Sequence, residues 1–157
     1  MVTPAFAAAD SGEDAFAQAV LSCLARHPGT RLPDTLPKAR LSPAVPSDPA
    51  IAEVIEHHGP TLKVASDTGA IYLTEEPGRC EVRGVDIEPL AAARALERRL
   101  TRAPYSGRSP LGVGIVEMEN ALFAGWLVKT RPGVLMVAAA RQKKDAPRTL
   151  FASVTRY

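Results

Sequence analysis

Residues 61–83 read TLKVASDTGAIYLTEEPGRCEVR, and this pattern predicts three short neighbouring β-strands. Apolar and β-branched residues predominate in 62–65 and 70–74, and the turn-forming Ser66-Asp67-Thr68-Gly69 between them signals a hairpin. A Pro-Gly turn then leads into a third strand over 80–83. The chain is therefore expected to contain an antiparallel sheet built from hairpins.

The third of these strands alternates in polarity. Cys80 and Val82 share one side of the strand, and Glu81 and Arg83 share the other. One face of the sheet is therefore expected to be polar. Four more strands are predicted in the last third of the chain, at 113–118, 122–130, 134–141 and 150–157. Their short connections favour antiparallel neighbours, since parallel strands need a crossover of a dozen residues or more.

Three amphipathic helices are predicted. Ser11 and Asp14 have capping-box spacing ahead of a first helix that ends at His27-Pro28-Gly29. Its buried stripe is Phe16, Ala19, Val20, Cys23 and Leu24. A second helix is expected over 48–59, and a third from Asp86 or Glu88 with Pro89 to about Arg102. Prolines recur between Pro28 and Pro49, so that segment is expected to run extended across the surface, neither as a helix nor as an interior strand.

This order of elements predicts an α+β fold, with an antiparallel sheet of about six to seven strands and two to three helices packed on one face. Residues 11–157 are expected to form a single domain. Residues 1–10 are expected to be a disordered arm or the remnant of a signal peptide, because Ala5-Phe6-Ala7 has the small-x-small form of a signal-peptidase site. Export to the periplasm or the exterior is therefore expected, and a cytoplasmic protein with an Ala-rich arm is the alternative.

Composition excludes several classes of protein. The chain has 157 residues, of which 46% are hydrophobic, and this share is too high for intrinsic disorder. A net charge of +2 falls short of the basic excess of a dedicated nucleic-acid binder, so no nucleic acid is expected as a partner. The longest apolar run, 134–140, is too short for a transmembrane helix. Richness in Ala, Pro and Arg indicates a GC-rich bacterial genome.

Cys23 and Cys80 are the two cysteines, and in an exported chain they are expected to form a disulfide. Two alternatives stay open from the sequence. The cysteines could be separate buried thiols, or they could join His27, His57 and His58 in a zinc-type site. The close paired spacings of a zinc knuckle are absent from the sequence, so no metal is expected.

No catalytic motif is present: the sequence has no phosphate loop, dinucleotide fingerprint, nucleophile elbow or zincin helix. Glu117 and Glu119 alternate onto one strand face and could form a carboxylate pair, although such pairs are usually a solvent face. We expect no catalytic residue and no cofactor. A small hydrolase whose active site cannot be assembled from spacing is an alternative.

The candidate binding residues are three arginines and two aromatic residues. Arg94, Arg98 and Arg102 recur every fourth residue of the third helix and could bind an anionic partner, although a solvated helix face is the simpler interpretation. Trp126 is expected to anchor the core, or else to line a pocket on the sheet with Tyr72, Met118 and Met136. The sequence thus favours a non-enzymatic exported domain that binds a protein or small ligand, for example as an inhibitor or accessory subunit. A cytosolic regulatory domain with free thiols is a further alternative.

Overall fold

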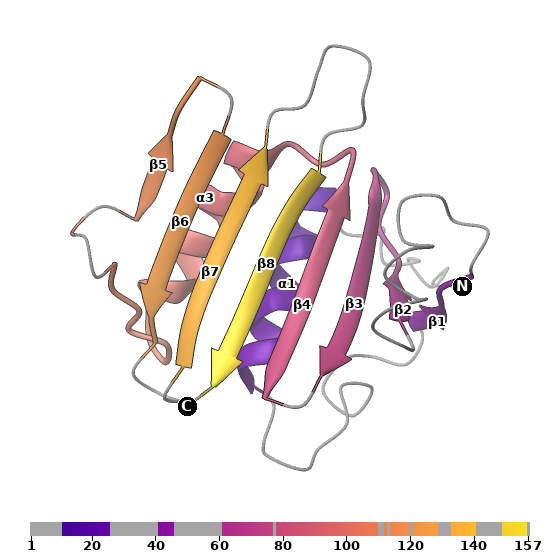
Figure 1. Cartoon of the computed structure of the whole chain (residues 1–157), viewed down its shortest axis with the longest axis horizontal. Coiled ribbons are helices and arrows are strands. Elements are labelled where there is room, and N and C mark those ends of the chain that lie inside the picture. Colours follow the sequence, from indigo (N-terminus) through magenta and orange to yellow (C-terminus); the bar gives the residue numbers. More distant parts are fainter. Residues whose placement is uncertain are drawn as a thin grey trace, which may run out of the picture.

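The computed structural model describes residues 11–25, 41–45, 61–76, 78–109, 112, 114–119, 121–128, 133–140 and 149–156. These residues form one antiparallel sheet and two helices, an α+β arrangement (Figure 1). The helices are α1 (Gly12–Ala25) and α3 (Pro89–Leu100). The strands are β1 (Leu41–Pro43), β2 (Thr61–Val64), β3 (Ala70–Glu76), β4 (Arg79–Val85), β5 (Ile115–Glu117), β6 (Ala121–Leu127), β7 (Gly133–Ala140) and β8 (Thr149–Arg156).

The sheet consists of two antiparallel meanders that meet at its centre. Its strand order is β1-β2-β3-β4-β8-β7-β6-β5. Short connections join β2 to β3, β3 to β4, β5 to β6 and β6 to β7, as the sequence predicts, whereas residues 44–60 separate β1 from β2. The junction is the pairing of β4 with β8, which sets Val82 opposite Ala152. The last strand in the chain is therefore an interior strand of the sheet.

Both helices lie on the same face of the sheet, behind it in Figure 1. Helix α1 packs on β3, β4 and β8, while α3 packs on α1 and β6. The core lies between this helix layer and the sheet. It is formed by Phe16, Val20 and Leu24 of α1, Ala93, Leu96 and Leu100 of α3, and inward-facing strand residues such as Ile71, Leu73, Val82, Leu122, Trp126, Leu150 and Val154.

The predicted start of α1 is confirmed. The Asp14 backbone N–H donates to Ser11 Oγ at 3.3 Å, and the Ser11 hydroxyl donates to the Asp14 carboxylate at 3.1 Å. A side-chain oxygen at this position stabilises a helix because it satisfies an N–H that has no intrahelical partner. The predicted stripe of α1, from Phe16 to Leu24, is buried.

The sheet has more strands than predicted, because residues 41–43 add the strand β1 within the proline-rich segment. Pro43 pairs with Leu62 in this edge strand, and the ladder continues through a hydrogen bond from the Ala44 N–H to the Thr61 carbonyl at 2.9 Å. Proline lacks an N–H, so an edge strand accepts it where an interior strand does not. The helix predicted over 48–59 lies outside the described residues.

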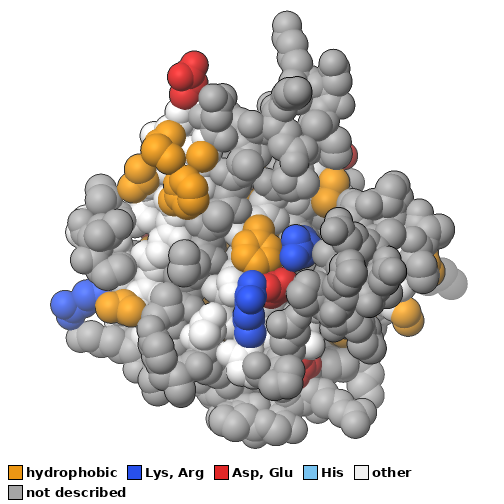
Figure 2. Space-filling model, in the orientation of Figure 1, with side chains coloured by type: hydrophobic (Ala, Val, Ile, Leu, Met, Phe, Trp, Pro, Cys, Tyr) orange, Lys and Arg blue, Asp and Glu red, His pale blue; other side chains and the backbone are white. Residues whose placement is uncertain are grey.

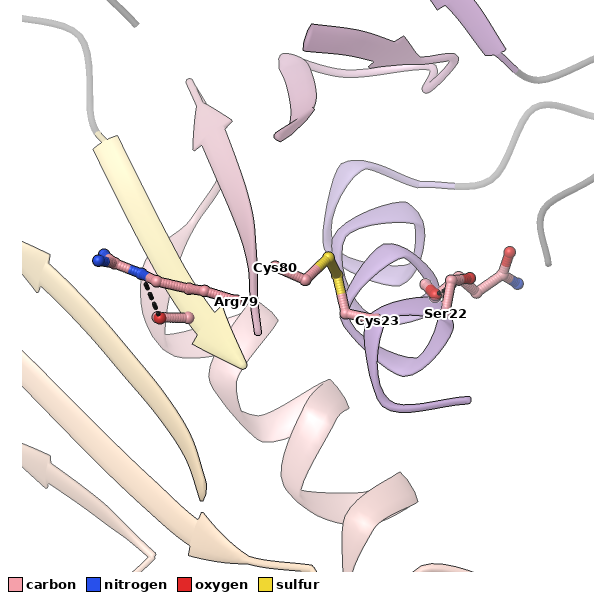
Figure 3. Close-up of a disulfide and its surroundings, with 6 residues drawn as sticks. Ser22, Cys23, Arg79 and Cys80 are labelled. Atoms are coloured by element: carbon pink, nitrogen blue, oxygen red, sulfur yellow. Dashed lines mark hydrogen bonds between the residues drawn. A yellow bond between two sulfur atoms is a disulfide. The ribbon is translucent and has the colours of Figure 1, made fainter. Parts of the chain in front are cut away.

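The disulfide between Cys23 and Cys80 is present and joins α1 to β4. Cys80 points from the sheet toward the helix layer, and the residue before it, Arg79, points the other way (Figure 3). Both cysteines are buried, at 1% and 3% exposed. The alternatives with free thiols or a thiolate metal site are therefore wrong, since the two sulfur atoms are bonded to each other.

Gly69 lies where the β2–β3 turn touches the end of β4. Its φ is +65°, and a Cβ atom there would lie 2.5 Å from the Val85 carbonyl oxygen and 2.9 Å from that of Asp86. Gly78 is a matched position, since its φ is +74° but a Cβ atom there would meet no heavy atom within 4 Å.

We expect Gly78→Ala to lower the free energy of unfolding by about 1–2 kcal/mol, the cost of left-handed backbone for an L-residue. Gly69→Ala should cost about 1 kcal/mol more, because the backbone must also move to relieve the close contacts. Urea unfolding of the two variants measures the difference. Equal losses for both variants would contradict the close approach at Gly69.

Candidate functional site

A groove of about 380 Å³ lies between the two helices. Its lining comes from both helices and from the loop after α3: Asp14, Leu21, Ala95, Arg98, Arg99, Arg102, Ala103 and Tyr105. The volume falls in the range of pockets that hold small organic ligands, roughly 300–1,000 Å³. The groove therefore has room for a small molecule.

Positive charge dominates this groove. Three of its lining residues are arginines, Arg98 and Arg99 in the last turn of α3 and Arg102 just after the helix, and one is an aspartate. The guanidinium of Arg99 lies 3.7 Å from the Asp14 carboxylate across the helix pair. In the part of the chain that the structure describes, neither Arg98 nor Arg102 has an ion pair. Among the described residues, the groove thus offers two guanidinium groups that are not engaged in an ion pair.

These arginines could instead be satisfying carbonyl groups at the end of α3, where positive charge is favourable. Other donors already reach two of the last four carbonyls of α3, and among the described residues neither Arg98 nor Arg102 donates to the other two. The Thr101 N–H and hydroxyl both donate to the Glu97 carbonyl, and the Gly107 N–H donates to that of Leu100. The Tyr105 N–H donates to the Arg102 carbonyl at 3.0 Å. The helix end is therefore closed by the loop, and the guanidinium groups are available to a ligand.

The loop that forms one wall of the groove is fixed at both ends. At its start the turn bonds described above hold Tyr105, which packs against the core. At its end Arg108 pairs with Leu127 of β6 through two backbone hydrogen bonds of 2.8 and 3.0 Å. A wall held in this way loses little conformational freedom when a ligand binds, which favours affinity.

The predicted binding residues lie in four different places. Arg98 and Arg102 meet in the groove, whereas Arg94 is exposed on α3 outside it. Trp126 and Tyr72 are each 1% exposed. Their binding roles stay predictions.

The suggestion that Trp126 and Tyr72 line one pocket is wrong. Residues that pair directly on neighbouring strands point to the same face of the sheet. Tyr72 pairs with Arg83, and Arg83 pairs with Phe151, so all three lie on the face opposite α1 and α3. Trp126 lies on the other face, within the core beneath the helix layer. The sheet itself separates the two rings.

The face of the sheet opposite α1 and α3 carries an ion cluster at its centre. The Glu81 side chain is 3% exposed and pairs with the guanidinium groups of Arg79 and Arg83. Arg83 also lies over the Phe151 ring at 4.9 Å, and Arg79 Nε donates to the Ser153 hydroxyl at 3.2 Å. Charges that are already paired in this way are less able to attract a ligand than those of the groove.

The same face carries exposed apolar side chains near the β5 edge. Figure 2 shows hydrophobic side chains gathered over β5 and β6. The exposed large hydrophobic residues of this region are Val116, Met118, Phe123 and Leu127. The largest apolar patch on an ordinary monomer is often of this kind, so the patch alone does not define a binding site.

No catalytic constellation forms among the described residues. Glu117 ends β5 and Glu119 follows in the turn, and both are exposed. His27, His57 and His58 lie outside the described residues. Within the described ranges, no group of three or more His, Cys, Asp or Glu side chains could hold a metal ion. None of the helices in those ranges has the length and apolar character needed to cross a membrane.

The sequence pattern identifies Arg98 and Arg102 of the groove as candidates, but not Arg99 or the residues opposite them. Asp14 was assigned only a capping role, and Leu21 falls outside the predicted apolar stripe of α1. The sequence does contain a signal for Leu21. A leucine beside the buried stripe widens the apolar surface of α1 toward a neighbouring helix. In comparisons with known proteins, neither a family model nor a curated protein nor a solved structure matches this chain.

Proposed function

We propose that this protein is an exported, non-enzymatic binding domain whose ligand carries a negative charge and binds in the groove between α1 and α3. The observation that carries the proposal is the pair Arg98 and Arg102, two guanidinium groups without an ion pair among the described residues, in a groove with a fixed wall. Hydrogen bonds to ionised groups are among the strongest in proteins, and guanidinium matches carboxylate and phosphate in shape.

An exported location, periplasmic or secreted, is part of this proposal. The disulfide supports it, because disulfides persist in oxidising compartments and are rare in the cytosol. The alternative of a cytosolic regulatory domain assumed free thiols, but Cys23 and Cys80 are joined in the disulfide. A role as an inhibitor or accessory subunit is compatible with a binding groove.

The face of the sheet opposite α1 and α3 is the second candidate surface. The observation in its favour is the exposed apolar group on β5 and β6, which could contact a protein partner. We favour the groove, because the cations Arg79 and Arg83 at the centre of the other face are already paired with Glu81. A small hydrolase has less support, because no nucleophile and base come together among the described residues.

The test measures binding of inorganic phosphate and sulfate to the full chain by calorimetry at low ionic strength, where exposed charges are least screened. We expect Arg98→Gln and Arg102→Gln each to weaken binding by about tenfold or more, since each removes a charge-assisted hydrogen bond. Arg94→Gln is the matched control, with the same charge change on the same helix but outside the groove. It should change affinity by less than about twofold.

Two results would overturn the proposal. Equal weakening by Arg94→Gln and Arg98→Gln would show that the anion responds only to the overall charge of the chain. Absence of binding of both anions to the unmodified protein would show that the groove does not receive them.

A further inference from the structure

The lining of the groove is apolar as well as cationic. Leu21 and Tyr105 are partly buried and pack against the core, and each also faces the groove. Ala95 and Ala103 extend this apolar surface next to the arginines. A site for a bare inorganic anion has no need of such a surface, because an anion gains nothing from apolar contact.

The size of the groove also favours a ligand that has an apolar part. A water molecule occupies about 30 Å³ of liquid. An inorganic anion is only a few times larger, so it would leave most of the groove's volume of about 380 Å³ to water. A ligand that fills the space must add an apolar part to its charged group.

Asp14 determines where the ligand can carry its charge. This carboxylate lines the groove and lies 3.7 Å from Arg99, so it offsets one of the three guanidinium groups. A second anionic group placed near Asp14 would meet a like charge, which is the repulsive element that specific sites commonly use. The charge of the ligand is therefore best placed at one end, against Arg98 and Arg102.

Building on the proposed function, we propose that the ligand is a small amphipathic anion. Its single anionic group, a phosphate or a carboxylate, binds Arg98 and Arg102, and an attached ring or short apolar chain packs on Tyr105 and Leu21. An aromatic ring suits this site, because rings stack on both tyrosine and guanidinium groups.

The test compares inorganic phosphate with phenyl phosphate, measured on the full chain by calorimetry. The two probes carry similar charge at neutral pH, so their difference reports contact with the ring. We expect phenyl phosphate to bind about tenfold more tightly, from the apolar area of the ring that leaves water. Tyr105→Ala should remove most of this advantage.

The outcomes separate this inference from the function on which it rests. If both probes bind the unmodified protein equally and Arg98→Gln weakens both, the anion site stands and the amphipathic ligand is wrong. If neither probe binds, both proposals fail. Because the comparison of probes uses the unmodified protein, the test holds even where Tyr105→Ala perturbs the loop. In that case Leu21→Ala, on the opposite wall, supplies the second variant and should likewise reduce the advantage of phenyl phosphate.

Discussion

Replacing Cys23 and Cys80 together by alanine is expected to lower the free energy of unfolding by about 4 kcal/mol. The two cysteines are 57 residues apart in the chain, and a crosslink that closes a loop of this length removes much conformational entropy from the unfolded state. The double substitution also removes buried sulfur contacts between α1 and β4. For a domain of this size, a loss of this magnitude should lower the melting temperature by roughly 8–16 °C.

Urea unfolding followed by circular dichroism measures the effect. The dependence of the free energy on urea concentration should also become steeper, because an unfolded chain without the crosslink exposes more surface. The matched control is the unmodified protein with its disulfide reduced, which should lose a similar free energy without any change of sequence. An alanine variant as stable as the oxidised protein would show that the link contributes nothing to folding.

Patterns of short range in the sequence predicted the local structure well. The Ser11 and Asp14 spacing, the stripe from Phe16 to Leu24 and the Gly69 turn depend only on residues within a few positions of one another. Helix periodicity and turn chemistry record such local preferences directly. The antiparallel α+β class follows from the same patterns.

These short-range patterns do not predict which strands pair when the strands are far apart in the chain. No local signal states that β8 pairs with β4, because several arrangements of two meanders satisfy the same alternation. Strand β1 was missed for a related reason, since a proline suppresses the strand signal although an edge position tolerates it.

The groove between α1 and α3 could likewise be predicted only in part from the sequence. Arg98 and Arg102 are one helical turn apart, so their spacing was visible in the sequence. Asp14 and Tyr105 line the same groove only because α1 packs beside α3 and the loop after α3 forms a hydrogen bond back to Leu100. A binding groove made by tertiary packing becomes visible only when the elements are assembled.

Two aromatic residues of β6 lie on opposite faces of the sheet and are expected to contribute very differently to stability. Trp126 lies in the core beneath the helix layer, and Phe123, three residues earlier, is 47% exposed on the opposite face. Trp126→Ala should lower the free energy of unfolding by about 3–5 kcal/mol, since it removes a large buried side chain and leaves a cavity. Phe123→Ala should cost less than about 1 kcal/mol, because its ring is already half in water.

Urea unfolding followed by circular dichroism compares the two variants without relying on tryptophan fluorescence. Trp126→Phe is a useful intermediate, because it keeps an aromatic ring in the core and should recover part of the loss. Similar losses for Trp126→Ala and Phe123→Ala would mean that the two faces of β6 are equally buried. That result would contradict the packing of α1 and α3 on the face of the sheet that carries Trp126, and with it the placement of α3 that forms the groove.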